Sequence, residues 1–331
     1  MSETTKLAPR IDEGHPCNPN PVLANPQNLS FEDQYFNALK NILTNGTVCI
    51  SGRQTDDSHV TRTKRVWGTQ FVIDMSKGIL PLMRSKHVAV KGSIQEILWI
   101  YQKCSNNVND LIPKIWNQWA DDDGSIRKTY GYQIGKETNA KCGHYPDQTH
   151  YVLDLLGKDS SSRHGVFNMW DCETLDDNNC VPCCYTCHFA ILDGKLNLMV
   201  TQRSADMIIG LPWNISQYAA LLLMFARHLG VEPGTYIHNI SDAHIYEDQY
   251  GSFDAIDEDA SNIFDNESLT DAFRDLITNY ENRDRFPEIH ATLQLDDSST
   301  DFWSITDHNF KIEGYKIWED CFEDVKFPVT K

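Results

Sequence analysis

The sequence has no apolar stretch long enough to cross a membrane, and its first residues lack the hydrophobic region of a secretory signal. We therefore expect a cytosolic protein, in the host cytoplasm if a phage encodes it. Positive charge is also scarce, since 29 lysines and arginines face 47 aspartates and glutamates for a net charge of −18. Such a field repels nucleic acid polymers, although a local basic pocket can still hold one phosphorylated nucleotide.

Ten cysteines would suit a disulfide framework in a short secreted chain, but in a cytosolic chain of 331 residues they indicate reduced thiols. The pairs Cys180/Cys183 and Cys184/Cys187 have C-x2-C spacing, and His188 follows, which raises the possibility of a zinc knuckle. These pairs overlap within one short segment, whereas a structural zinc site draws its ligand pairs from separate turns. We therefore expect no metal.

Helical and strand patterns mix along the chain without a regular βαβ alternation. Apolar spacing predicts helices over 31–43, 93–102 and 216–229, and strands over 66–73, 185–192, 195–201 and 235–240. Asp193-Gly194 between two of these strands predicts a tight hairpin. Ser93 followed by Glu96 predicts an N-terminal capping box. The mixture favours the α+β class.

We predict a catalytic domain over 31–331, with one segment before it and one unusual segment within it. Residues 1–30 are rich in proline and asparagine without periodicity, which predicts an extended arm. A stretch that begins near Glu247 is rich in acidic residues but lacks the ordered spacing of a calcium loop. We interpret 247–285, approximately, as an acidic surface insertion.

One cysteine becomes a candidate nucleophile because of the residues around it. C5 of a pyrimidine is a poor nucleophile until a thiolate adds at C6, and that chemistry needs an activated cysteine, a polar group at the base edge, a general base and an anion site. Separated blocks supply these residue types: 96–99 (EILW), 115–121 (IWNQWAD), 130–133 (YGYQ), 159–163 (DSSSR), 182–183 (PC), 202–206 (QRSAD), 210–215 (GLPWNI), 242–246 (DAHIY) and 312–315 (IEGY).

In these blocks and their order, the sequence resembles thymidylate synthase from about residue 31 to residue 331. The resemblance implies a mixed, twisted β-sheet packed with long helices and a homodimer joined sheet to sheet. It also implies dUMP as substrate and 5,10-methylenetetrahydrofolate as co-substrate, with no metal.

The resemblance assigns the thiol and the phosphate site. Cys183 would attack C6, and Arg203 would activate it and hold the nucleotide phosphate. Ser204 would give the phosphate a hydroxyl. Arg163, followed by His164 where the family has a second arginine, would reach the phosphate in the neighbouring subunit.

The base and the sugar would meet a second group of residues. Asn214 would face the pyrimidine edge, where an amide fits uracil and a carboxylate would favour cytosine, although it could also cap a helix. His244 and Tyr246 would bind the sugar 3′-hydroxyl. Glu96 would organise proton transfer near O4, and Tyr130 would help to remove the C5 proton.

The folate would lie against aromatic, acidic and small residues, with a lysine at its glutamyl tail. These positions are Trp116, Trp119, Asp206, Gly210, Trp213 and Lys86. An aromatic cluster is more often core, and Trp119 could be only that.

Several departures from the family bear on the reaction. Cys184 replaces a histidine, Cys180 a leucine and Val181 a proline, and the tail ends in Lys331 instead of a small apolar residue. A more polar, less closed site would let water capture the exocyclic methylene intermediate. We therefore expect 5-hydroxymethyl-dUMP as product, with thymidylate synthesis as the alternative. Hydroxymethylation of dCMP or CMP and an inactive regulatory homologue are further alternatives.

One phosphate ligand is missing. The family's N-terminal phosphate-binding arginine falls near Ser58, and Arg53, Arg62 and Lys64 are the candidates to replace it.

Overall fold

A six-stranded sheet forms the centre of the computed structural model, which describes residues 29–54, 60–111, 114–285, 288–294, 301–314 and 325–327. Its strands are β1 (Thr47–Gln54), β2 (Val60–Asp74), β5 (Val166–Asn168), β6 (Cys184–Leu192), β7 (Lys195–Asp206) and β8 (Glu232–Tyr246). They lie in the order β1-β2-β8-β7-β6-β5. The β7 and β8 strands run parallel, whereas the other neighbours pair antiparallel.

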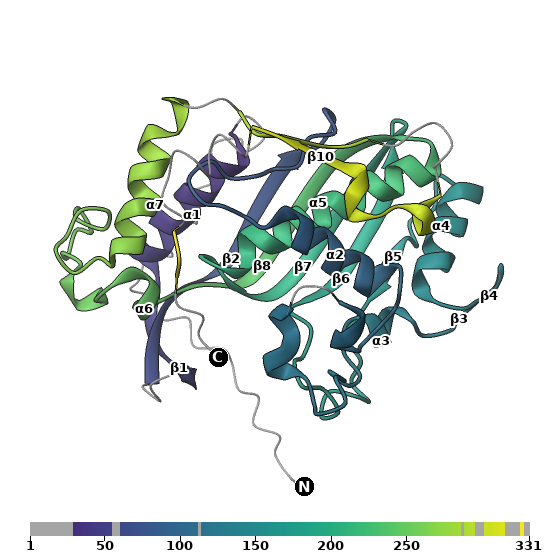
Figure 1. Cartoon of the computed structure of the whole chain (residues 1–331), viewed down its shortest axis with the longest axis horizontal. Coiled ribbons are helices and arrows are strands. Elements are labelled where there is room, and N and C mark those ends of the chain that lie inside the picture. The colour runs from purple at the N-terminus through teal and green to yellow at the C-terminus, as the bar shows by residue number, and fades with distance from the viewer. Residues whose placement is uncertain are drawn as a thin grey trace, which may run out of the picture.

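Helices cover one face of this sheet (Figure 1). They are α1 (Phe31–Asn45), α2 (Val90–Tyr101) and α5 (Gly210–Leu229), with α3 (Gly131–Ile134), α4 (Gln148–Lys158), α6 (Glu247–Tyr250) and α7 (Asp271–Asn282) around them. Two small two-stranded sheets pair β3 (Thr138–Ala140) with β4 (Gly143–Tyr145) and β9 (His290–Leu293) with β10 (Phe310–Glu313). This confirms the α+β prediction.

Short 3₁₀ turns connect these elements. They span Val108–Asp110, Lys114–Trp119, Phe253–Ala255, Arg283–Arg285, Phe302–Ser304 and Asp307–Asn309. No helix among the described residues is long and apolar enough to cross a membrane.

The α5 helix lies at the centre of the core, as its all-round apolar sequence predicts. From Ala219 to Met224 all but Leu223 are fully buried, and Leu223 is nearly so. The hairpin prediction is confirmed too, because Asp193 and Gly194 both adopt positive φ angles, 51° and 73°, between β6 and β7. That conformation matches the twist of the flanking strands.

Two capping predictions are wrong. The α2 helix begins at Val90 instead of after Ser93, because Val90 is itself buried and extends the packed face by one turn. The Ser93 hydroxyl donates to the Val90 carbonyl at 2.8 Å, so it does not cap the helix. Asn214 is no N-cap either, since α5 already begins at Gly210.

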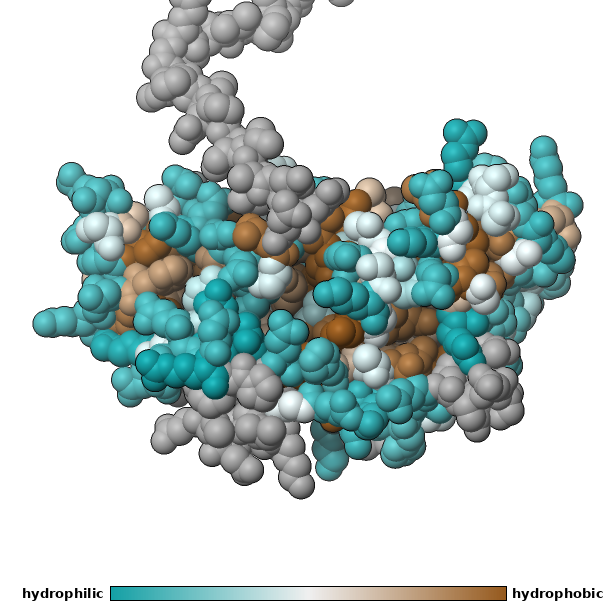
Figure 2. Space-filling model, turned by 90° about the horizontal axis from the view of Figure 1, so that it is seen from above, coloured by the Kyte–Doolittle hydropathy of each residue, from teal (hydrophilic) through white to brown (hydrophobic). Residues whose placement is uncertain are grey.

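The two faces of the sheet differ sharply in burial. One cross-strand row, Phe167, Cys187, Val200, His238 and Phe71, is buried beneath the helices. The adjacent row is Val166, His188, Met199, Ile237 and Val72, all at least partly exposed. The second face therefore presents apolar side chains without covering helices. From the upper side of Figure 1, the molecule shows hydrophobic patches between hydrophilic side chains (Figure 2).

The predicted acidic insertion contains a folded apolar interior. Tyr250, Phe253 and Phe273 are buried and their rings pack together. Its carboxylates Glu247 and Asp254 both pair with Arg62 of β2. The predicted arm, apart from Leu29 and Ser30, and the tail residue Lys331 lie outside the described residues.

Candidate active site

The loop that carries Cys183 is fixed by hydrogen bonds just before β6. The Cys183 amide donates to the Tyr130 hydroxyl at 3.0 Å, and the Arg203 amide donates to the Cys183 carbonyl at 2.8 Å. Tyr130 is buried and adopts a positive φ of 40°. The cysteine itself remains partly exposed. A ligand can therefore reach a thiol whose backbone is held in place.

Arg203 of β7 encloses the same loop. Its Nη2 donates to the Val181 carbonyl at 2.8 Å, and its Nε donates to the Pro182 carbonyl at 3.1 Å. The Nη2 atom also lies 3.8 Å from the Cys183 sulfur. Positive charge at this distance attracts negative charge on the sulfur. The predicted neighbours Cys183 and Arg203 are thus brought together.

The adjacent thiols have a different environment. Cys184 is 3% exposed and Cys187 is fully buried, where it contacts the Tyr101 hydroxyl at 3.2 Å. Burial raises the pKa of Cys184 well above its usual range and that of Cys187 to about 12. Both are neutral core thiols near pH 7, and neutral thiols are poor nucleophiles.

No cysteine in the described part of the chain is bridged, and no metal-binding group of three or more histidine, cysteine or acidic side chains occurs there. Cys184 and Cys187 of β6 are both buried in the core, although side chains three residues apart on a regular strand point to opposite faces. An irregularity in the pairing of β6 with β7 between Cys184 and Thr186 allows this.

Glu96 of α2 is a buried carboxyl with a titration range close to neutrality. Burial raises its pKa to about 7, against polar contacts from Gln217, Trp213 and Trp116 that lower it. The Trp213 indole nitrogen donates to its Oε2 at 2.8 Å. A carboxyl with this pKa can both give and take a proton at physiological pH.

A buried chain of polar groups leads to Asn214. The Asn214 side chain accepts from Gln202 Nε2 at 3.2 Å and donates to Gln217 Oε1 at 3.1 Å. Gln202 in turn contacts His238 at 2.7 Å, and His238 contacts the Tyr236 hydroxyl at 2.6 Å. Burial lowers the pKa of His238 to about 3, so this ring is neutral. The chain fixes which atoms of Asn214 donate and accept.

Most of these hydrogen-bonded polar groups were not predicted from the sequence. Gln202 falls in a recognised block, but no role was predicted for it, and His238 was read only as part of a strand. Their contact depends on the parallel pairing of β7 with β8, which local patterns do not encode.

Two of the rings predicted for the folate lie near Tyr130, the residue predicted to help remove the C5 proton. The centroid of Trp116 is 5.1 Å from that of Tyr130 and 5.2 Å from that of Trp119. Trp116 is buried, whereas Trp119 is partly exposed. They form an aromatic wall between the α2 region and the Cys183 loop.

Asp206 and Lys86 have structural partners at the start of α5. Asp206 Oδ1 accepts from the amides of Ile208 and Ile209 at 2.9 and 3.0 Å, and its Oδ2 accepts from Gln249 at 2.8 Å. The Lys86 ammonium donates to the Ile208 carbonyl at 2.6 Å and lies 5.6 Å from the Phe327 ring centroid. Both residues thus stabilise the turn before Gly210.

The sugar and phosphate candidates line the β7–β8 junction. Ser204 pairs with Asp242, and Asp206 pairs with His244, across the two parallel strands. His244 and Tyr246 stand edge to face, with ring centroids 5.1 Å apart. Four residues predicted for binding are therefore adjacent on β7 and β8: Ser204, Asp206, His244 and Tyr246.

The remaining phosphate candidates lie apart from this junction. Arg163 and His164 are exposed on the loop between α4 and β5. Arg62 is engaged by Glu247 and Asp254, and the Lys64 ammonium donates to the Leu43 carbonyl at 2.6 Å. Two of the three candidates for the missing arginine are thus occupied, and the side chain of Arg53 lies outside the described residues.

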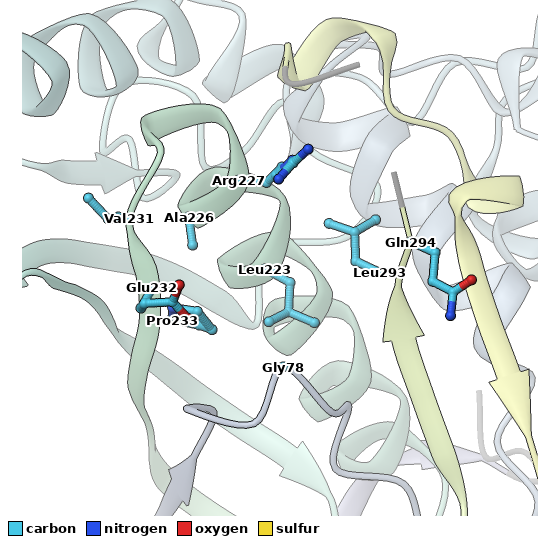
Figure 3. Close-up of a pocket in the computed structure, with 9 residues that line it drawn as sticks. All are labelled: Gly78, Leu223, Ala226, Arg227, Val231, Glu232, Pro233, Leu293 and Gln294. Atoms are coloured by element: carbon cyan, nitrogen blue, oxygen red, sulfur yellow. The ribbon is translucent and has the colours of Figure 1, made fainter. Parts of the chain in front are cut away.

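Two cavities lie away from these residues. A hollow of about 480 Å³ lies between the end of α5, the start of β8 and the end of β9 (Figure 3). Another, of about 310 Å³, lies beside the start of α1. Neither contains a residue predicted for catalysis or binding.

Comparison with known proteins agrees with this geometry. The sequence profile of the thymidylate synthase family matches residues 33–327. The chain belongs to the thymidylate synthase family. Thymidylate synthase 1 of Bacillus subtilis strain 168 is 38% identical over 226 residues, which cover 65% of this chain and 79% of the relative. The thymidylate synthase of Bacillus phage phi3T has the same identity and coverage.

A solved structure shows the same fold. Thermostable thymidylate synthase A from Bacillus subtilis superposes with a TM-score of 0.76 at 31% identity, covering 92% of this chain and all of that one. The family transfers a one-carbon unit and uses methylenetetrahydrofolate as co-substrate. The predicted fold and family are therefore confirmed.

Proposed function

We propose that this chain converts dUMP to dTMP, with methylenetetrahydrofolate supplying both the carbon and the hydride. The observation that carries the proposal is the enclosure of Cys183 by Arg203, with Nη2 3.8 Å from the sulfur. Cys183 adds to C6 of the base, and Arg203 stabilises the thiolate and meets the phosphate together with Ser204. Cys183 is also partly exposed, whereas its neighbour Cys184 is buried.

The base is read by Asn214. Its oxygen and nitrogen are assigned by Gln202 and Gln217, so the amide has a defined orientation. In that orientation the side chain can accept from N3–H and donate to O4, which is the pattern of uracil. A cytosine edge lacks the N3–H donor and presents an amino group instead, which supports dUMP over dCMP or CMP.

Proton transfer is the task of Glu96 and Tyr130. Glu96, with a pKa of about 7, exchanges a proton with O4 as charge develops on the ring. Tyr130, whose hydroxyl contacts the Cys183 amide, helps to remove the C5 proton. The retention of this chemistry speaks against an inactive regulatory homologue.

The folate fits the aromatic wall near Cys183. Trp116, Trp119 and Trp213 would supply the aromatic surface, and Gly210 adjoins Asp206 at the same turn. Asp206 is the acceptor for the pterin ring. Lys86, which now contacts Ile208 and Phe327, would meet the glutamyl tail at the cost of those contacts.

A homodimer would complete the phosphate site. The open sheet face exposes Val166 to 40% and Met199 to 42%, which suits a second copy of the same face. Arg163 and His164 are exposed beyond its edge strand, where they can reach a neighbouring subunit.

Hydride capture is favoured over water capture by the burial of Cys184. The expectation of hydroxymethylation depended on a polar wall formed by Cys180 and Cys184 and on a tail that ends in Lys331. Cys184 is 3% exposed and neutral, and Lys331 lies outside the described residues. Hydroxymethylation of dUMP remains a second candidate because Cys180 is only partly buried and lies close enough to influence Tyr130 electrostatically.

One incubation separates these outcomes. The protein is mixed with methylenetetrahydrofolate and either dUMP or dCMP, and product mass and dihydrofolate absorbance are both recorded. The proposal predicts dTMP with one dihydrofolate per turnover. A hydroxymethylated product without dihydrofolate would establish the second candidate, and turnover of neither nucleotide would contradict both.

A further inference from the structure

Asp242 lies between two cationic or ionisable side chains at the β2–β8–β7 junction. Its Oδ1 is 3.1 Å from Nδ1 of His244, and its Oδ2 accepts from Arg65 Nη1 at 3.0 Å. The strand register holds the group together, because Arg65 of β2 pairs with His244 and Trp67 pairs with Asp242. Asp242 also pairs with Ser204 of β7.

The carboxylate determines which nitrogen of His244 carries a proton. Although burial acts to raise the pKa of Asp242, its hydrogen bond with His244 and the charge of Arg65 bring that pKa below its usual value. An ionised carboxylate only accepts hydrogen bonds, so Nδ1 of His244 must be the donor. In the neutral ring, Nε2 is then a bare acceptor.

We propose that Asp242, held by Arg65, is a positioning residue that presents His244 Nε2 as an acceptor for the sugar 3′-hydroxyl. This inference rests on the proposed function, in which His244 meets the sugar of dUMP. It adds a determinant of ligand selection: the site requires a hydrogen-bond donor at the 3′ position. A nucleotide without that donor leaves a largely buried acceptor unpaired, which costs binding free energy.

Calorimetric binding of two ligands tests the proposal. Dissociation constants are measured for dUMP and for 2′,3′-dideoxyuridine 5′-monophosphate, which lacks the 3′-hydroxyl. The wild-type protein should prefer dUMP by about 10- to 100-fold. In Asp242→Ala the ratio should fall to about threefold or less, because His244 loses its fixed tautomer and orientation, while affinity for the dideoxy analogue stays nearly unchanged.

General damage to the fold would weaken both ligands equally, so the ratio isolates positioning. Asp254→Ala is the matched control, since Asp254 also pairs with an arginine of β2, the phosphate candidate Arg62. Both ligands carry the same 5′-phosphate, so a change at Arg62 would act on them equally. The ratio in Asp254→Ala should equal that of the wild type. If Asp242→Ala does not fold, the ratio is measured in Arg65→Gln instead. The Arg65 side chain is 47% exposed, so its replacement should leave the fold intact. The ratio in Arg65→Gln should fall about threefold.

The outcomes separate the two levels of inference. If Asp242→Ala folds and keeps the wild-type ratio, the positioning role alone is overturned. If Asp242→Ala does not fold, a wild-type ratio in Arg65→Gln overturns it instead. A wild-type protein that binds dUMP and the analogue equally overturns both the positioning role and the His244 sugar contact. Failure of the wild type to bind dUMP contradicts the proposed function itself.

Discussion

Arg203 Nη2 lies 3.8 Å from the sulfur of Cys183, and the same guanidinium donates to the carbonyls of Val181 and Pro182. One side chain therefore fixes the loop before β6 and places charge beside its thiol. A planar guanidinium with several donors can do both, whereas an ammonium is a single point charge.

Replacement of Arg203 by lysine should consequently damage binding and chemistry together. We expect kcat/KM for dUMP to fall at least ~100-fold, with a raised KM, because the phosphate and the loop compete for one ammonium. Steady-state kinetics measure this. Arg127→Lys is the matched control, an exposed arginine paired with Asp121 outside the predicted site, and it should retain wild-type kinetics. Wild-type kinetics in Arg203→Lys would refute the dual role.

Asn214→Asp should shift base preference towards cytosine. A carboxylate accepts from the cytosine amino group but cannot donate to O4 of uracil. Turnover of dUMP should fall ~100-fold or more, and binding of dCMP should improve relative to dUMP. Competition binding with both nucleotides measures the change. An unchanged preference would mean that Asn214 does not face the base.

Glu96→Gln should alter how stability depends on pH. The pKa of Glu96 is about 7 in the folded protein, whereas its ordinary value is 4.5. Between pH 4.5 and pH 7 the folded state therefore keeps a proton that the unfolded state has lost. This contribution lowers the free energy of unfolding by up to about 3 kcal/mol as pH rises from 4.5 to 7, and it is constant above. Glutamine does not ionise, so Glu96→Gln lacks this pH-dependent contribution to the free energy of unfolding.

Denaturant unfolding at pH 5 and pH 8 provides the comparison. The wild type should lose more stability than Glu96→Gln between the two pH values. Parallel losses in the two proteins would show that Glu96 already ionises near its ordinary value.

Met199→Glu should disrupt self-association through the open sheet face. Met199 lies in the middle strand of the exposed apolar row, and a carboxylate there would be buried without a partner in a symmetric interface. Sedimentation velocity should show a dimer for the wild type and a dimer weakened ~100-fold or more for the variant. A stable dimer in Met199→Glu would place the interface elsewhere.

The sequence predicted elements well where apolar spacing decides them, and less well at their ends. The prediction began this helix at residue 216, at the start of the all-round apolar run, whereas α5 begins at Gly210. Pro212 lies in its first turn, a position that proline tolerates. Ser93 suggested a helix start, but burial of Val90 extends α2 before it. Core packing decides both boundaries, and a local pattern does not contain that information.

Many of the predicted site residues lie on or beside β6, β7, β8, α2 and α5, whereas Arg163 and His164 lie apart from them. The polar groups behind the site were not predicted. Gln202 and His238 meet only because β7 and β8 run parallel in one register. Asp206 and Lys86 likewise acquire structural partners that no spacing reveals. Long-range pairing and buried polar contacts therefore account for most of what sequence reasoning lacked.

The most direct test of the central claim is the site of covalent capture by 5-fluoro-dUMP in the presence of methylenetetrahydrofolate. The account predicts an adduct on the peptide of Cys183, its loss in Cys183→Ser and its persistence in Cys184→Ser, whose thiol is buried and neutral. Mass spectrometry of the digested complex reads all three. An adduct on Cys184, or trapping that survives in Cys183→Ser, would contradict the assignment of the nucleophile.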